Sequence, residues 1–375
     1  MIRRAIATAP EFPDAYNNLG NVLLELGRYQ EAEGAYRKVI ELVPGHLDAR
    51  TNLGVALKML DRIDEAETVL REAIELDPEH VDAWHNLGNV LNRQERREDA
   101  IIAFRSAIEL RPFDARNYGQ LGALYRKMDE PEQAAAVYRK WLENDPPNPV
   151  AAHLLAAIEG GDTPDRASNE FVQALFDPFA ASFDIVLKGL QYQAPELVGD
   201  ALAQCLGAPA AQLSILDAGC GAALCGPLLR PYARRLVGVD LSPAMSRKSS
   251  ARGVYDELMV AELTAYLGDC KAGYEVIAAA DTWCYFGALE AITAAAAGAL
   301  TPGGHLVFTV EDAETRASPR GFRLEPHGRY SHREDYVRAV LAAAGLTVDA
   351  ITTATLRQEA DKPVIGLVVL AKRPA

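Results

Sequence analysis

The sequence lacks the features of a membrane, secreted or nucleic-acid-binding protein. No apolar stretch approaches about 18 residues without a polar interruption, which argues against a transmembrane helix, and the first residues, MIRRAIATAPEFPD, contain no apolar signal segment. The five cysteines have no framework spacing and fit a reducing compartment. With 38 Lys and Arg against 52 Asp and Glu, the formal charge of −14 argues against a nucleic-acid groove. We therefore expect a cytoplasmic protein without a nucleic-acid or membrane partner.

What the chain does contain is enough apolar residues, 49% over a length of 375, to build about two domains. The amino-terminal half repeats every 34 residues. The repeated positions are the prolines Pro10, Pro44, Pro78, Pro112 and Pro146, the glycines Gly20, Gly54, Gly88 and Gly122, and the large residues Tyr36, Leu70, Phe104 and Tyr138. This period resembles that of tetratricopeptide repeats, each a pair of antiparallel helices. We predict an all-α solenoid over residues 1–158, with a partial first repeat, four full repeats and a capping helix over residues 149–157.

One row of amides follows the same period along the first helix of each predicted repeat. Its members are Asn18, Asn52, Asn86 and Gln120. In such solenoids this helix lines the concave face, which holds peptides or partner proteins. An amide both donates and accepts hydrogen bonds, so this row could pair with the backbone of an extended peptide. The alternative is that the amides satisfy neighbouring helix ends and that the repeats are a structural scaffold.

The most informative stretch of the carboxyl-terminal half is SILDAGCGAALCGPLLRPYARRLVGVD, residues 214–240. It predicts a strand ending in Asp217, a glycine-bearing loop, a short helix, and a second strand ending in Asp240. A dinucleotide site requires a third glycine where this chain has Leu224, so the dinucleotide fingerprint fails. The remaining pattern, D-x-G-x-G, resembles the first motif of class I S-adenosylmethionine-dependent methyltransferases.

The resemblance implies a Rossmann-like α/β domain over residues 201–375, with a seven-stranded, mostly parallel sheet whose last strand is antiparallel. The later segments agree with this expectation. Further strands are predicted over residues 255–260, 274–280 and 305–310, with a final hairpin over residues 346–355 and 364–372. Ser331 and Glu334 have the spacing of a capping box that would open a helix near Arg333.

The resemblance also implies that S-adenosyl-L-methionine is the cofactor. Asp217 would face its ammonium group, Asp240 its ribose hydroxyls, and Glu262 with Leu263 its adenine. The full set of cofactor-binding residues that we predict is Asp217, Gly219, Cys220, Gly221, Asp240, Leu241, Met245, Glu262, Leu263 and Asp281. Two departures stand out: Ala222 and Ala223 replace the usual Thr-Gly, and several serines occupy the helix after Asp240.

Between the two predicted domains lies a break in composition, Gly160 to Pro164, followed by the segment ASNEFVQALFDPFAASFD. The spacing of its Phe and Asp residues resembles the helical lid that precedes the sheet in many small-molecule methyltransferases. We predict that residues 159–200 form a linker and this lid. The alternative is a helix that only packs between two domains.

Candidate catalytic residues follow the predicted fourth and fifth strands. Asp281 and Tyr285 come first, with a helix N-cap as the structural alternative for Asp281. Trp283 could contact substrate or belong to the core. The segment GRYSHREDY resembles the same stretch in bacterial methyltransferases that carry these repeats, which makes Arg329 and Tyr330 candidate substrate contacts. The nearby imidazoles are candidate bases, His327 and His332. No metal site is expected, because a zinc site needs a third ligand.

The function predicted from the sequence is transfer of a methyl group to an O, N or C acceptor, with the repeats recruiting a protein or peptide-borne substrate. Two alternatives remain open. The substrate could be a free small molecule, with the repeats serving assembly, or the chain could be a scaffold whose transferase domain has lost catalysis.

Overall fold

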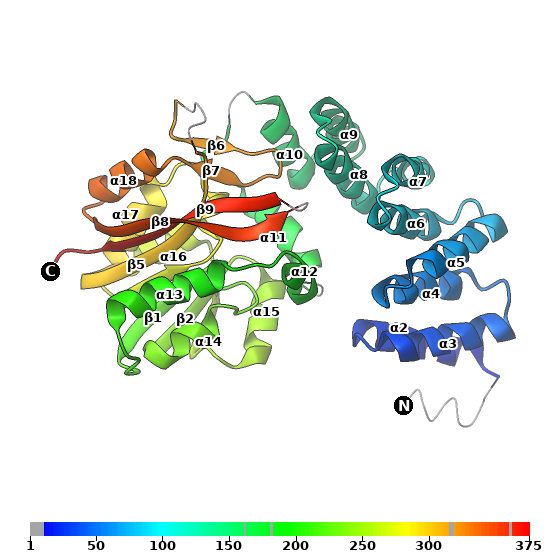
Figure 1. The fold of residues 1–375 in the computed structure, drawn as a ribbon, viewed down its shortest axis with the longest axis horizontal. Helices are drawn as coiled ribbons and strands as arrows, with labels where there is room; N and C mark the ends of the chain where they lie inside the picture. Colours follow the sequence, from blue (N-terminus) through cyan, green and yellow to red (C-terminus); the bar gives the residue numbers. More distant parts are fainter. Residues whose placement is uncertain (1–10, 161–162, 181–182, 315–318, 360–361) are drawn as a thin grey trace. The chain divides into compact units, whose positions relative to one another are not determined.

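The computed structural model describes residues 11–160, 163–180, 183–314, 319–359 and 362–375. The chain divides into two compact units, Met1–Ala151 and Ala152–Ala375 (Figure 1). The predicted partial first repeat falls on residues 1–10, outside the described part of the chain. Within the described residues, none of the helices has the length and apolar character needed to span a membrane.

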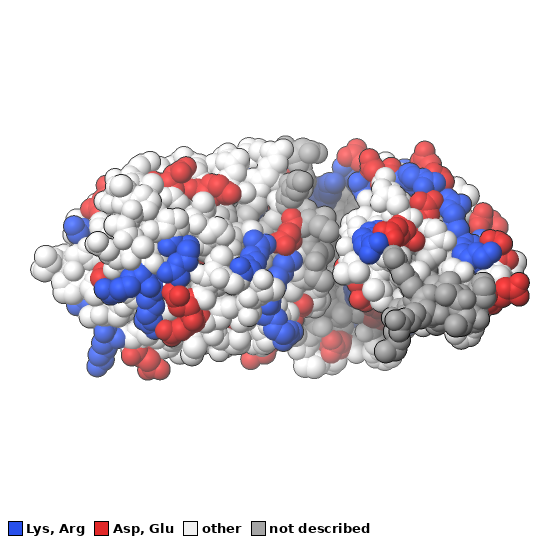
Figure 2. Space-filling view, turned by 90° about the horizontal axis from the view of Figure 1, so that it is seen from below, with Lys and Arg blue, Asp and Glu red and all other residues white. Residues whose placement is uncertain are grey.

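The first unit is a stack of helix pairs with the predicted period. Its helices are α2 (Pro13–Glu25), α3 (Tyr29–Leu42), α4 (Leu47–Met59), α5 (Ile63–Leu76), α6 (Val81–Arg93), α7 (Arg97–Leu110), α8 (Ala115–Lys127) and α9 (Pro131–Asn144). Ion pairs link successive repeats, from Arg62 to Glu33 and from Arg96 to Glu67. Basic and acidic side chains are interspersed on the visible face of this unit (Figure 2). The all-α repeat prediction is confirmed.

The two helices of each pair approach each other most closely at one glycine. A Cβ built at Gly88 of α6 would lie 2.6 Å from the ring of Phe104 on α7, and Gly20, Gly54 and Gly122 face Tyr36, Leu70 and Tyr138 in the same way. Phe104 is completely buried. Because protein interiors are close-packed, the missing methyl group is what lets the large side chain lie flat on the partner helix.

The second unit begins inside α10 (Pro149–Glu159), earlier than the predicted boundary at residue 158. The reason is local packing. The ring of His153 lies 3.9 Å from that of Phe171, and its Nε2 hydrogen bonds to the carbonyl of Gly328 at 2.9 Å. The residues after α10 form α11 (Asn169–Phe179), α12 (Phe183–Gly189) and α13 (Ala194–Leu206), which also belong to this unit.

A single mixed sheet organises the second unit. Its strands in the described residues are β1 (Leu213–Ala218), β2 (Ala233–Asp240), β3 (Glu257–Val260), β4 (Tyr274–Ala279), β5 (Leu300–Asp312), β6 (Phe322–Leu324), β7 (Tyr330–His332), β8 (Thr347–Glu359) and β9 (Lys362–Lys372). Seven of them have the order β3-β2-β1-β4-β5-β9-β8, and β9, the last, is antiparallel to both neighbours. This confirms the predicted sheet. The short strands β6 and β7 were not predicted.

Helices cover both faces of the sheet, as expected for a mostly parallel one. Alternate strand residues such as Ile277 and Val276 enter opposite cores. One core contains residues of α16 (Leu263–Asp269), α17 (Glu290–Ala299) and α18 (Glu334–Ala343), and the other contains residues of α13 and α14 (Gly226–Leu229). The helix that follows β2 is α15 (Pro243–Arg252).

The predicted capping box at the start of α18 is wrong. Ser331 lies in β7, where its hydroxyl donates to Oε1 of Glu325 at 2.7 Å, and α18 begins at Glu334 without a side-chain cap. Pairing of β7 with the end of β5, Glu311 with Ser331, draws the serine into the sheet.

We predict that Gly88→Ala destabilises the first unit by about 1–3 kcal/mol, because the new methyl group overlaps the ring of Phe104. The matched control is Gly119→Ala in α8, where a Cβ meets no atom within 4 Å. That change should stabilise the helix by about 0.5–1 kcal/mol. Denaturant midpoints followed by far-ultraviolet circular dichroism measure both effects, and equal midpoints for the two variants would contradict the packing argument.

Candidate functional site

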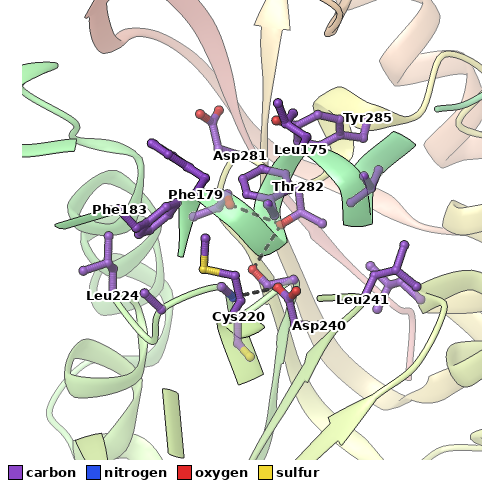
Figure 3. Close-up of a pocket in the computed structure, with 18 of the residues that line it drawn as sticks. Leu175, Phe179, Phe183, Cys220, Leu224, Asp240, Leu241, Asp281, Thr282 and Tyr285 are labelled. Carbon is purple, nitrogen blue, oxygen red and sulfur yellow. Dashed lines mark hydrogen bonds between the residues drawn. The ribbon is translucent and has the colours of Figure 1, made fainter. Parts of the chain in front are cut away.

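A cavity of about 450 Å³ opens at the carboxyl ends of β1, β2 and β4, beneath α11 and α12. Side chains from these two helices, among them Leu175, Phe179 and Phe183, form its apolar roof (Figure 3). Ligands of open α/β sheets bind at this edge, in the crevice outside the carboxyl ends of the strands. The helical segment predicted to be a lid therefore lines the cavity.

The glycine loop after β1 forms the floor of the cavity. Gly219 and Gly221 both have left-handed backbone conformations, with φ of 78° and 49°. A side chain at Gly219 would collide with Thr282, so this glycine allows close packing of two loops. The Cβ position of Gly221 is instead open, with only the ring of Phe183 at 4.0 Å. The backbone of Gly221 is thus accessible from the cavity, which a bulkier residue would prevent.

Asp240, at the end of β2, holds this floor in place. Its Oδ2 accepts a hydrogen bond from the amide of Gly221 at 2.8 Å (Figure 3). Its Oδ1 accepts one from the amide of Ser242 at 2.8 Å. Burial raises the pKa of the Asp240 carboxyl, and the two backbone donors act in the opposite direction. Each oxygen retains acceptor capacity for a ligand hydroxyl.

Asp217, at the end of β1, is a second carboxylate beside the cavity. Its side chain is buried, and its Oδ2 accepts a hydrogen bond of 2.6 Å from the hydroxyl of Tyr255. Burial raises the pKa of Asp217 to about 7, and the charge of Asp240 acts in the same direction. Neither carboxylate has a cationic partner among the described residues.

The remaining predicted cofactor residues also line the cavity, namely Cys220, Leu241, Met245, Glu262 and Leu263. Glu262 is the N-cap of α16, where its oxygens accept from the amides of Thr264 and Ala265 at 3.0 and 2.8 Å. It also forms an ion pair with Arg166 at 3.0 Å. All the residues predicted to bind the cofactor are therefore brought to one cavity.

Asp281 lies at the other end of the cavity. Its φ of 53° is unusual for a residue with a side chain. Its amide donates to Oγ1 of Thr309 at 2.8 Å, and its Oδ2 accepts from Nη1 of Arg357 at 2.8 Å. The helix N-cap alternative is not what the structure shows, because the following helical turn, η2 (Trp283–Tyr285), is preceded by Thr282.

Arg357 organises this end of the cavity and was missed by sequence reasoning. Its side chain is 1% exposed, and its three nitrogens donate to Asp281, Glu311 and Glu359. Arg329 joins the same network through Glu359, at 2.7 Å, and through the hydroxyl of Tyr285, at 3.4 Å. A sequence signal existed, since three acids follow or end strands here and buried carboxylates require a cation.

The groups of this network strongly affect the pKa of Glu311. Although burial raises the pKa of a carboxyl, the neighbouring His327, Arg357 and Arg329 hold the pKa of Glu311 well below its usual range. The carboxylate therefore stays ionised, which favours the pairing that keeps Arg357 in place.

Three residues predicted to reach the substrate do not line the cavity. Trp283 is fully buried and stacks on Phe308 at 4.0 Å. Tyr330 is buried and donates to the carbonyl of Pro164 at 2.9 Å, and His332 is buried with its Nε2 3.0 Å from the carbonyl of Gly287. The centre of the segment GRYSHREDY is β7, whose residues are buried inside the unit.

His327 is also away from the cavity lining. Its Nδ1 accepts a hydrogen bond from the amide of Arg329 at 3.3 Å, so in that tautomer its Nε2 carries the hydrogen and donates to Glu311 at 3.1 Å. Both ring nitrogens are therefore engaged by the protein. The structure gives His327 the role of supporting the Arg329 loop and Glu311.

The first unit has a separate polar cavity of about 370 Å³. Of the predicted groove residues, Asn52 and Asn86 line it, whereas Asn18 and Gln120 do not. Asn52 donates to Oδ1 of Asn21 at 3.1 Å, and Asn86 donates to the carbonyl of Asp82 at 2.8 Å. The other polar residues of the lining are Asn17, Asn21, Asp48, Thr51, His80, Asp82, His85 and Arg116.

Comparisons with known proteins agree with this division. Family models of tetratricopeptide repeats match residues 1–34, 23–91, 81–114 and 118–150, and a methyltransferase-domain model matches residues 190–351. The chain therefore carries tetratricopeptide repeats in its amino-terminal part, followed by a methyltransferase domain.

Individual relatives match only parts of the chain. Human methyltransferase-like protein 27 is 36% identical over 120 residues, which are 29% of this chain and 49% of that protein, so the chain spans about half the length of this relative. A crystal structure of MamA is 25% identical and covers 39% of this chain and 85% of its own, with a TM-score of 0.36. The 1,6-didemethyltoxoflavin-N1-methyltransferase of Burkholderia thailandensis is 20% identical and covers 57% and 94%, with a TM-score of 0.44.

We predict that Arg357→Met destabilises the second unit by about 3–5 kcal/mol, because it leaves buried carboxylates without their cation. Arg338→Met is the control, since Arg338 pairs with Glu334 on the surface and its loss should cost about 1 kcal/mol or less. Melting temperatures compare the two. Equal shifts would show that the buried network does not hold the unit together.

Proposed function

We propose that the chain is an S-adenosylmethionine-dependent methyltransferase that transfers a methyl group to an O, N or C acceptor inside the lid-covered cavity. The observation that carries the proposal is the position of Asp240. It is a half-buried carboxylate at the end of β2, with its oxygens beside the open floor at Gly221. Such a group suits the two hydroxyls of a ribose, which can both donate to it.

The charge of the cavity supports the same cofactor. Asp217 and Asp240 bring two carboxylates without a cationic partner among the described residues. Buried carboxylates require compensation, which a ligand bearing an ammonium group and hydroxyl donors provides. In this proposal Asp217 pairs with the ammonium, Asp240 with the ribose, and Met245, Glu262 and Leu263 surround the adenine. The bound cofactor supplies an electrophilic methyl group on a sulfonium centre.

The acceptor enters from the Asp281 end. Asp281, Tyr285 and Arg329 line the cavity there, and the Nη2 of Arg329 has no hydrogen-bond partner among the described residues. We assign substrate contact to Arg329 and Tyr285, and proton acceptance from the methyl acceptor to Asp281. The roof residues Phe176, Phe179 and Phe183 exclude water and contact the apolar part of the substrate. Trp283, Tyr330, His327 and His332 are left out of this site.

The repeats add a second binding function to the proposal. The polar groove around Asn52 and Asn86 supports binding of an extended peptide or protein segment, which then delivers or accompanies the substrate. The apolar roof of the cavity favours the second candidate, a free small molecule. The two candidates share the catalytic site and differ in the partner.

Titration of the full-length protein with S-adenosylhomocysteine in a calorimeter tests the cofactor site. We expect binding by the wild type and its loss in Asp240→Ala, because the ribose acceptor and the anchor of the Gly221 amide disappear together. Asp200→Ala, on the exposed face of α13, is the control and should bind as the wild type does. A wild type without affinity for this ligand would end the proposal.

The same variants identify the acceptor class. Cell extract incubated with the full-length protein and methyl-labelled cofactor should accumulate label with the wild type and not with Asp240→Ala. Label in the macromolecular fraction supports delivery by the repeats, and label in the low-mass fraction supports a free metabolite.

We also predict that cofactor affinity rises with pH across neutrality. Burial raises the pKa of Asp217 to about 7, so its neutral form persists below that pH and its ionised form, which pairs with an ammonium group, dominates above it. The affinity for S-adenosylhomocysteine should therefore increase about tenfold between about pH 6 and about pH 8. Asp217→Asn should bind more weakly and lose this dependence. A wild-type affinity that is constant over the range contradicts the assignment.

A further inference from the structure

The serines in the helix after Asp240 were unexplained by the sequence, and they differ sharply in the structure. Ser249 of α15 is fully buried, whereas Ser250 is exposed. A serine inside a helix usually bonds the carbonyl four residues earlier in its own helix or faces solvent. Ser249 instead directs its hydroxyl out of the helix to the carbonyl of Gly221, with an Oγ–O distance of 2.5 Å. Because a carbonyl only accepts, the hydroxyl is the donor.

This hydrogen bond is the second one that fixes the backbone of Gly221. The amide of Gly221 donates to Asp240, and its carbonyl accepts from Ser249, so both backbone polar groups are fixed by neighbouring elements. Gly221 is also the residue whose Cβ position opens toward the cavity roof. Its orientation therefore sets the shape of the floor on which the proposed cofactor rests.

The loop needs this support because Ala223 adopts a backbone conformation that is unfavourable for alanine. Ala223 has a φ of 65°, a left-handed conformation that costs a residue with a side chain about 1–2 kcal/mol. Its amide donates to the carbonyl of Cys220 at 2.7 Å, which closes the turn around Gly221. A glycine at this position would remove the steric cost, and the chain has alanine instead. The bond from α15 stabilises the turn from outside.

We propose that Ser249 is a positioning residue for the cofactor site, which acts by orienting Gly221 and does not itself touch the ligand. The inference rests on the proposed cofactor function. It also connects Ser249 with Ala223, since the hydrogen bond from the buried serine offsets the strained turn.

Calorimetric titration of the full-length protein with S-adenosylhomocysteine tests the inference. Ser249→Ala should weaken binding about 5- to 10-fold, which is the effect of losing one hydrogen bond of ordinary strength. Ser250→Ala is the matched control, with an affinity equal to that of the wild type. Ser249→Cys keeps a weak donor of similar size and should bind with an affinity between those of wild type and Ser249→Ala.

The outcomes distinguish the positioning role of Ser249 from the proposed cofactor function. If the wild type binds and Ser249→Ala binds equally well, with only its melting temperature lowered, Ser249 has a structural role and the inference is overturned. If the wild type does not bind, the proposed function fails and the inference fails with it. If Ser249→Ala does not fold, Ser249→Cys decides, because wild-type affinity in that variant together with full stability would also overturn the role of the hydroxyl.

Discussion

One carboxylate, that of Asp240, connects the cavity floor, the helix after β2 and, through Ser242, the cavity roof. It ends β2, it accepts from Gly221 in the cavity floor, and it accepts from Ser242 at the start of α15. Ser242 in turn donates to Asp177 of α11, one of the helices in the cavity roof, at 2.5 Å. A group that only accepts, with two oxygens, can serve these elements at once. The cavity floor, α15 and the cavity roof are therefore positioned by one carboxylate at the end of a buried strand.

The repeat unit could be predicted almost completely, because its determinants are local and recur. The glycine and large-residue pairs, such as Gly88 with Phe104, are close in sequence and identical in role in every repeat. The turns between paired helices could not be predicted in the same way. They take left-handed φ values at Gly27, Asp61, Glu95 and Asp129, and three of these residues are not glycine. Helix packing imposes the turn, so the turn residues carry no readable signal.

Arg357 could not be predicted as the partner of the acids at the substrate end, because its contacts join residues far apart in the chain. Arg357 lies on β8, 76 positions from Asp281 and 46 from Glu311, and only the pairing of β5 with β9 and of β9 with β8 brings them together. A different strand pairing, of β7 with β5, explains why the prediction for Tyr330 and His332 was wrong. Their segment is polar enough for a loop, yet the register of β7 with β5 turns both side chains inward.

The substrate end and the cofactor end of the cavity therefore differ in how their carboxylates are paired. At the substrate end, the guanidinium groups of Arg357 and Arg329 face three carboxylates, and Arg357 has committed every nitrogen, so Asp281 is oriented before any substrate arrives. Groups fixed in advance need no reorganisation during reaction. At the cofactor end, Asp217 and Asp240 lack cations among the described residues, and burial disfavours their charge. A cationic, hydroxyl-bearing ligand removes that penalty. The carboxylates that lack a cation therefore lie where the cofactor is proposed to bind, whereas those at the substrate end are paired with Arg357.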